Sequence, residues 1–316
     1  MAITHPGWQR PRLRLLDTGE RRATWLELLY DLVFVVAVAE LAGLLGEHDL
    51  TGFLGLFVPV WWAWAGYVFY ANRFDTDDLS HRLLVGAQLL AVVLMAAALG
   101  DPVNRSALFA VAYVAVRLLL IVAYLRVSRH VPQARRLALS YVTGFSAAAA
   151  IWLLSLALTG PARYAAWAVA MVVDLATPLV SRRYQGELPP QSEHLPERFG
   201  LFVVIVLGEV VAAIVLGVKG HALTPLTLLI AAAGVAVTVV VWSLYFDRLD
   251  GRVVLRTRAA GQIWVYSHLP LAMALVAFGV GVEQLILHPG GYAAALIGAA
   301  LVVVAATLAA QRKVSR

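Results

Sequence analysis

Acidic side chains stand inside segments that are apolar enough to cross a lipid bilayer. The stretch from Ala23 to Leu45, ATWLELLYDLVFVVAVAELAGLL, carries Glu27, Asp31 and Glu40. A charge at the centre of a bilayer costs at least about 2.5–3.5 kcal/mol on insertion scales, so such residues usually face a bundle interior or water. We therefore expect these acids to be paired with a base, or to exchange a proton or a cation.

The three acids differ in depth, because each helical residue adds about 1.5 Å of rise. Glu27 lies near the boundary of the segment, where we expect water to reach it. Asp31 is one turn further, on the same face and roughly 10 Å into the segment. Glu40 lies near the opposite end and points away from Asp31, so we expect it to meet the headgroup region or another helix.

Two acids and two bases lie deeper in other apolar segments. Glu209 stands roughly 18 Å from the start of its segment, and Asp174 lies at similar depth from the other side. Arg117 and His268 are the buried bases. One interpretation is that Arg117 pairs permanently with an acid and ties helices together. The other is that Asp31 and Glu209 are proton or cation sites. One arginine does not neutralise the three acids Asp31, Asp174 and Glu209, and desolvation raises the pKa of a carboxyl group towards neutral pH. The candidate ion- or substrate-binding residues are Glu27, Asp31, Arg117, Asp174, Glu209 and His268.

A second polar group lies in the stretch NRFDTDDLSHR. It contains Asn72, Arg73, Asp75, Asp77, Asp78 and His81. Such a density of oxygen ligands can hold a hard cation or, with histidine, a transition metal. We favour a structural interpretation, in which Arg73 pairs with Asp75 and either Asp77 or Asp78 begins the next helix. No metal-binding, cofactor-binding or catalytic signature occurs in the sequence, so we assign no metal, cofactor or catalytic residue, and a non-enzymatic role is favoured.

The composition indicates the elements that must position these residues. Hydrophobic residues make up 61% of the 316 residues and charged residues 14%, with a mean hydropathy of +0.79. This is too little polar surface for a water-soluble protein. Segments of roughly 20 apolar residues cross a bilayer as helices, and ten are predicted: 24–45, 51–72, 80–99, 104–125, 137–158, 162–181, 198–218, 223–246, 260–285 and 291–311. Turn residues separate several of them, namely Gly100-Asp101-Pro102, Thr159-Gly160-Pro161, Pro189-Pro190 and Pro289-Gly290-Gly291. The sequence therefore predicts an all-α, polytopic membrane bundle.

The basic residues predict the orientation of this bundle. Cytoplasmic loops are enriched in Lys and Arg, and most of the 25 such residues fall in loops on the side of the N-terminus. The opposite loops hold only Arg105, Arg163 and Lys219. We expect a basic cytoplasmic tail (1–23), a transmembrane domain (24–311) and a cytoplasmic C-terminal tail (312–316) in the inner membrane. The net charge of +6 is spread over these loops, which argues against nucleic-acid binding.

Short similarities between segments raise the hypothesis of a parallel internal repeat of helices 1–3 with helices 7–9. LVFVVAVAE is similar to LFVVIVLGE, and YVFYANRFD is similar to WSLYFDRLD. Aromatic residues also run along helix 2, at positions 61, 62, 64, 67 and 70. We interpret them as core packing, with a ligand cavity as the alternative. The last apolar segment has many small residues, which suit close helix packing, including packing between copies of the chain.

The chain resembles a known family. RRATWLELLYDLVFVVAVAELAGLL, WWAWAGYVFYANRFDTDDLSHRLL, ERFGLFVVIVLGE, LYFD and YSHLPL…VGVE are similar to the bacterial low temperature requirement A membrane proteins, in unbroken order from about Arg22 to Glu283. The resemblance implies a polytopic membrane protein and carries over no catalytic residues. One position departs from the pattern: Val210 follows Glu209 where a small hydroxyl residue is expected, which removes a hydrogen bond that serine would give the carboxylate.

Three functions remain as hypotheses. Acids at mid-depth favour a secondary transporter or ion-conducting protein, whose partners would be membrane lipids and a small-molecule or ion substrate. A membrane-embedded enzyme acting on a lipid or isoprenoid would instead use Asp75, Asp77, Asp78 and His81 at its cytoplasmic mouth. A non-catalytic membrane factor is the third hypothesis.

Overall fold

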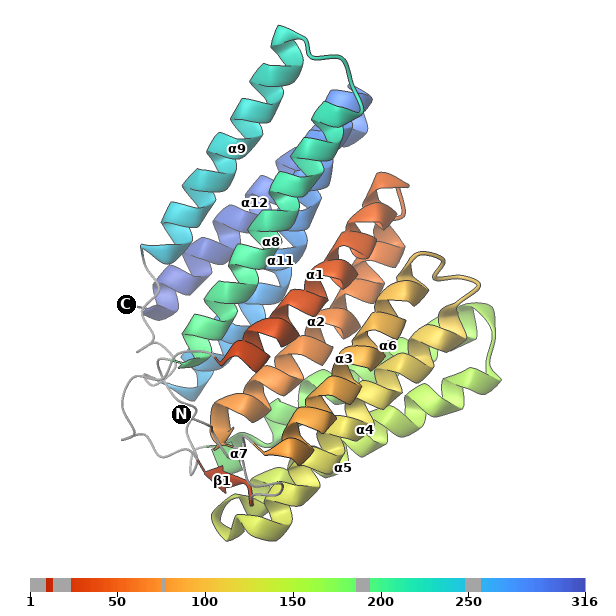
Figure 1. Ribbon diagram of the computed structural model, residues 1–316, viewed down its shortest axis with the longest axis vertical. Helices are drawn as coiled ribbons and strands as arrows, with labels where there is room; N and C mark the ends of the chain where they lie inside the picture. Colours follow the sequence, from red (N-terminus) through yellow and green to blue (C-terminus); the bar gives the residue numbers. More distant parts are fainter. Residues whose placement is uncertain (1–9, 14–23, 76–77, 186–193, 248–256, 316) are drawn as a thin grey trace. The chain divides into compact units, whose positions relative to one another are not determined.

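The computed structural model describes residues 10–13, 24–75, 78–185, 194–247 and 257–315. Within these ranges, 10 helices are long and apolar enough to cross a membrane. The predicted all-α polytopic fold and its number of spans are therefore confirmed, and the helix ends agree with the predicted segments to within a few residues (Figure 1).

The elements follow one another as helices joined mostly by short turns. The first half contains β1 (Arg12–Leu13), α1 (Trp25–Gly46), α2 (Leu50–Arg73), β2 (Phe74–Asp75), α3 (Leu79–Leu99), α4 (Ser106–His130), η1 (Pro132–Ala134), α5 (Arg135–Leu154), η2 (Ser155–Ala157), α6 (Gly160–Val180) and α7 (Arg182–Gln185). The second half contains α8 (His194–Lys219), α9 (Pro225–Phe246), α11 (Arg258–Leu287) and α12 (Gly291–Ser315).

The chain divides into two compact units. Unit 1 comprises residues 1–37 and 58–195, and unit 2 comprises residues 38–57 and 196–316. In unit 1, α3, α4, α5 and α6 pack against one another in chain order, as Figure 1 shows. In unit 2, α11 packs against α12 and α9. The proposed internal repeat stays a prediction.

Local sequence explains where several helices begin. Thr224 and Thr257 precede α9 and α11, and their hydroxyls accept hydrogen bonds from backbone N–H groups of the first turn, which is the usual role of an N-cap threonine. Gly160 begins α6 with a φ of 55°, a conformation that favours glycine, and Pro161 follows it. The predicted turn at residues 159–161 is thus confirmed, whereas Pro189-Pro190 lies outside the described residues.

A short strand pair accompanies the helices. β1 pairs antiparallel with β2, with Arg12 opposite Asp75 and Leu13 opposite Phe74. The sequence did not predict this pairing, because two residues are too few to show strand alternation. It attaches part of the N-terminal segment to the end of α2.

Aromatic side chains of α2 form much of the core of unit 1. Trp61, Trp62 and Trp64 are fully buried, and Tyr67 and Tyr70 are each 1% exposed. Their interpretation as core packing is therefore confirmed. Each of these residues buries a large apolar area, and Trp62 and Trp64 lie beside charged side chains of this unit.

Glycines bring the helices of unit 2 close together. A Cβ atom at Gly279 of α11 would lie 2.9 Å from the Cα of Val210 in α8. A Cβ atom at Gly281 would lie 2.7 Å from Ile297 of α12. Small residues at such contacts are typical of membrane helices, whose association depends on close van der Waals packing.

Candidate functional site

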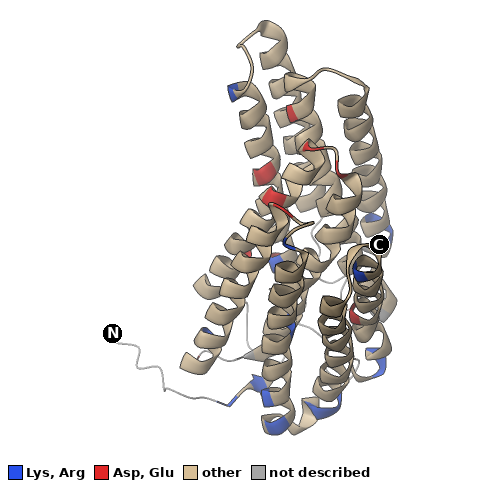
Figure 2. Cartoon of the chain, turned by 90° about the vertical axis from the view of Figure 1, so that its right-hand side faces the viewer, with Lys and Arg blue, Asp and Glu red and all other residues tan. Residues whose placement is uncertain are grey.

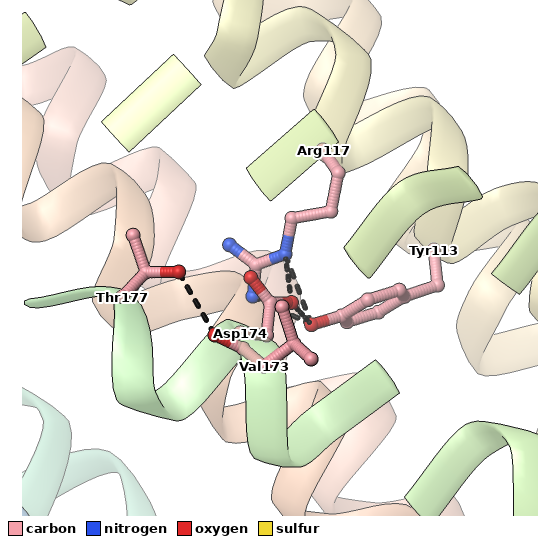
Figure 3. A network of polar contacts seen from close by, with 5 residues as sticks. All are labelled: Tyr113, Arg117, Val173, Asp174 and Thr177. Carbon is pink, nitrogen blue, oxygen red and sulfur yellow. Dashed lines mark hydrogen bonds and ion pairs between the residues drawn. The ribbon is translucent and has the colours of Figure 1, made fainter. Parts of the chain in front are cut away.

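Arg117 and Asp174 form a buried ion pair in unit 1 (Figure 3). The Nε atom of Arg117 in α4 lies 2.9 Å from Oδ2 of Asp174 in α6, and both side chains are completely buried. Tyr113, one turn before Arg117 on the same face of α4, donates its hydroxyl hydrogen to Asp174 Oδ2. The same hydroxyl oxygen accepts hydrogen bonds from Arg117 Nε and Nη2, at 2.9 and 2.7 Å. The predicted pairing of Arg117 with one acid is confirmed, and the partner is Asp174.

Aromatic rings and a glycine surround this guanidinium group. Its central carbon lies 6.0 Å from the ring of Trp62, 4.9 Å from Tyr113 and 5.3 Å from Phe145, within the range of cation–π attraction. A Cβ atom at Gly66 of α2 would lie 2.7 Å from Arg117 Nη1. A side chain at position 66 would therefore force the guanidinium group to shift from its present position. The pair holds α4 to α6 and fills the space beside α2.

Asp31 is buried elsewhere in the same unit. Its exposed fraction is 1%, and its Oδ1 atom accepts a 2.7 Å hydrogen bond from the indole Nε1 of Trp64. A tryptophan N–H satisfies a carboxylate oxygen without neutralising its charge. Asp31 is therefore held in place by α2, one turn along α1 from Glu27.

Glu27 is buried, contrary to the expectation that water reaches it. Its exposed fraction is 3%, because it lies at the start of α1 under the buried side chain of His194. Glu27 Oε2 is 3.4 Å from His194 Nε2, and it also accepts a 2.8 Å hydrogen bond from the backbone N–H of Thr24. The Thr24 hydroxyl in turn accepts the backbone N–H of Glu27, which completes a capping box. Asn72 Nδ2 lies 3.4 Å from His194 Nδ1, so a ring that accepts there presents Nε2–H to Glu27.

The polar group between α2 and α3 makes a helix cap, an ion pair and ring contacts where it is described. Asp78 caps α3: its Oδ1 accepts the backbone N–H of His81 at 2.8 Å, and its Oδ2 pairs with Arg126 Nη2 at 3.2 Å. The prediction that an acid begins this helix is confirmed for Asp78. The His81 ring stacks beside Tyr67, with the Tyr67 hydroxyl 3.4 Å from Nε2. Arg73 is buried. Asp77 and the side chain of Asp75 lie outside the described residues, so the pairing of Arg73 with Asp75 stays a prediction.

His268 belongs to a hydrogen-bonded group in unit 2. Its Nδ1 donates to the backbone oxygen of Trp264 at 2.7 Å, because a carbonyl only accepts. Nε2 of the neutral ring is then an acceptor, and the hydroxyl of Tyr245 lies 2.8 Å from it. Gln311 donates to Ser267 next to this ring. The group links α9, α11 and α12, and both ring nitrogens are engaged.

Glu209 lies apart from His268 within unit 2. The ring of Phe199 is 4.8 Å from that of His268, and Glu209 follows Phe199 by ten residues, about 15 Å along α8. Glu209 is partly buried and interacts electrostatically with Glu283 of α11, which is also partly buried. Among the described residues, neither carboxylate makes a hydrogen bond or an ion pair.

Sequence reasoning missed several of these partners. Glu283 is an acid inside an apolar span, which is the same feature that identified Glu209, but it was not among the predicted site residues. Tyr113 could have been found from its position four residues before Arg117. His194 lay outside the predicted span 198–218, and α8 in fact begins with it.

In Figure 2, most basic positions lie near helix ends, and several acidic positions lie along the helices.

Comparison with known proteins places the chain in a family. It is 28% identical over 343 residues to an uncharacterised protein of Rhizobium meliloti (strain 1021), an alignment that covers 100% of this chain and 82% of that protein. No solved structure matches the chain significantly. The model of the bacterial low temperature requirement A protein matches residues 22–316, which is nearly the whole sequence. The chain is therefore a member of the bacterial low temperature requirement A family.

Proposed function

We propose that this protein moves protons or another small cation across the bacterial inner membrane, with both termini in the cytoplasm. Glu209 and Glu283 are the proposed exchanging carboxylates. The proposal rests chiefly on one observation: these two acids lie on adjacent helices of one unit, interact with each other, and make no hydrogen bond or ion pair with the described residues.

Asp174, Asp78 and Glu27 differ in this respect. Asp174 is compensated by Arg117 and Tyr113, and Asp78 by Arg126 and a helix N-terminus. Glu27 faces His194 and caps α1. A compensated acid stabilises its helices and has no need of an external ion. Glu209 and Glu283 have no such partner in the part of the chain that the structure describes, so an external proton or cation is the natural neutralising partner.

Two neighbouring carboxylates also oppose each other's charge. Like charges that act on each other disfavour simultaneous ionisation, and one bound proton or cation relieves this repulsion. The site would then fill and empty with the concentration of that ion. Exchange of this kind is what an ion-coupled transporter or a conducting pathway requires.

The lipid-modifying enzyme receives less support. Among the acids assigned to that enzyme, Asp78 has a described side chain, and both of its carboxylate oxygens are engaged. Oδ1 accepts a backbone N–H of α3 as its cap, and Oδ2 accepts hydrogen bonds from Ser80 and Arg126. A carboxylate that caps a helix is a poor general base, because its protonation would weaken the hydrogen bond of the cap and break the ion pair. The His81 ring likewise packs against the rings of Tyr67 and Tyr70.

Flux in reconstituted vesicles tests the proposal. Proteoliposomes with a pH-sensitive dye inside would be given an inward proton gradient, then Na⁺ and K⁺ gradients with the matching dyes. We expect wild-type protein to dissipate at least one gradient faster than empty liposomes, and Glu209→Gln and Glu283→Gln to abolish that excess. Glu40→Gln is the matched control, because Glu40 is an exposed acid in an apolar helix. Wild-type vesicles that behave as empty liposomes for all three ions, or Gln variants with wild-type flux, would refute the proposal.

A further inference from the structure

Unit 1 carries a cluster of exposed arginines at one end of its helices. Arg129 lies in the last turn of α4, Arg135 and Arg136 open α5, and Arg182 and Arg183 open α7. All five are exposed. Among the described residues, no carboxylate pairs with any of them. We refer to these five residues as the arginine surface.

Side-chain contacts bring the segments of this surface together. The hydroxyls of Ser140 in α5 and Ser181, which precedes α7, are 2.7 Å apart. Gln185 donates to the hydroxyl of Tyr141 at 2.9 Å. Ser140 follows Arg136 by about one helical turn, and Ser181 directly precedes Arg182. The arginines of α5 and α7 therefore lie on neighbouring elements, and a turn of three residues, η1, joins α5 to the end of α4.

The backbone at the start of α5 adds to the positive charge of its two arginines. α5 begins after Ala134, which provides no side-chain cap, and its first two residues are arginines. Basic residues in a first turn are unfavourable next to the positive end of the helix dipole. α3, α9 and α11, by contrast, begin with Asp78, Thr224 and Thr257 as side-chain caps. Positive charge is thus concentrated where the described residues supply no anion as a partner.

We propose that the arginine surface binds the phosphate headgroups of anionic phospholipids in the adjacent leaflet. The five arginines lie at the end of α4, at the start of α5 and just after the end of α6, and all three helices are candidate membrane spans. In a bilayer this position corresponds to headgroup level. Arginine presents a planar fork of N–H donors that matches a phosphate. Clusters of this size next to membrane spans bind anionic lipids, at about 1 kcal/mol for each basic residue. The Arg183 guanidinium lies 4.6 Å over the ring of Tyr184, which is an arrangement suited to an interfacial position. This binding is independent of any transport activity.

Lipid-dependent stability of the purified full-length chain tests this inference. The protein would be melted in neutral detergent with increasing mole fractions of phosphatidylglycerol, and in parallel with phosphatidylcholine and with inorganic phosphate. We expect phosphatidylglycerol alone to raise Tm. For Arg135→Gln with Arg136→Gln, and for Arg182→Gln with Arg183→Gln, the mole fraction that gives half of this rise should increase roughly 25-fold, at about fivefold for each arginine. The side chains are exposed, so the Tm without lipid should stay at the wild-type value.

The matched control removes the same charge at another helix end. Arg312→Gln with Lys313→Gln alters two basic residues in the last turn of α12 and should leave the lipid response within a few-fold of wild type. An equal Tm rise with phosphatidylcholine would overturn the proposal, as would a rise with inorganic phosphate alone. A control variant that loses the response as fully as the arginine variants would also overturn it, because the effect would then reflect net charge.

Discussion

Removing the acid from the Arg117–Asp174 pair should destabilise the protein more than removing the base. Asp174→Asn leaves a guanidinium group that is completely buried and does not lose its proton. Arg117→Met leaves a carboxyl group, which can take up a proton and keep its hydrogen bond to Tyr113. Methionine also fits among the rings that now surround the guanidinium group.

The expected magnitudes follow from the geometry. Loss of one partner of a buried pair costs about 3–5 kcal/mol. In Asp174→Asn, Tyr113 can still bond to the amide, which recovers about 1 kcal/mol and leaves a cost of about 2–4 kcal/mol. For Arg117→Met we expect less than about 2 kcal/mol, the cation–π contribution included. The double variant should be more stable than Asp174→Asn, because no uncompensated charge remains in it.

Reversible unfolding in mixed micelles of dodecyl maltoside and SDS would measure these free energies. Arg105→Met is the matched control, because Arg105 is exposed and its Nη1 donates to the backbone oxygen of Ala97. We expect this control to cost less than about 1 kcal/mol. The reasoning is refuted if Asp174→Asn is as stable as wild type, if Arg117→Met is the more damaging change, or if the two changes are additive.

Three further predictions concern α2, α3 and the orientation of the chain. Gly66→Ala should lower stability by about 1–3 kcal/mol in the same assay, because its Cβ would lie 2.7 Å from Arg117 Nη1; an equal loss in the Arg117→Met background would contradict this cause. Asp78→Ala should lower stability by at least about 0.5–2 kcal/mol through loss of the α3 cap, whereas Asp78→Asn should keep most of the cap; equal losses would argue against capping. Reporters fused at Gly46 should be external and those at Arg129 internal, and a reversal at either position would contradict the proposed orientation.

The spans were predictable from sequence because a bilayer imposes its own length. A helix of about 20 apolar residues is long enough to cross it, and turn residues such as Gly160-Pro161 separate one span from the next. Long runs of apolar residues therefore located helix ends to within a few residues. The pairing of β1 with β2 lacked any such signal, since it involves two residues on each side.

The partners of the buried acids were less predictable. Depth along a helix placed Asp174 and Glu209 at similar levels, and it gave no means of choosing between them as the partner of Arg117. That choice depends on which helices are neighbours: α5 packs against both α4 and α6, and Tyr113 bridges the two charges. Glu27 was expected to be hydrated because it begins a span, but His194 covers it. Both the partner of Arg117 and the burial of Glu27 depend on which helices are neighbours in the fold, and the periodicity of the sequence does not show this.

The departure at Val210 has a packing explanation. Consecutive residues of a helix point about 100° apart, so Val210 and Glu209 face different neighbours. Val210 is 1% exposed, and its backbone lies against Gly279 of α11, where a Cβ atom would approach to 2.9 Å. A serine hydroxyl at this position would face α11 or bond to a carbonyl of its own helix. The lack of a hydrogen-bonded partner for Glu209 among the described residues therefore does not depend on valine at position 210. Val210→Ser should leave the ion flux measured in the proteoliposome assay at the wild-type value.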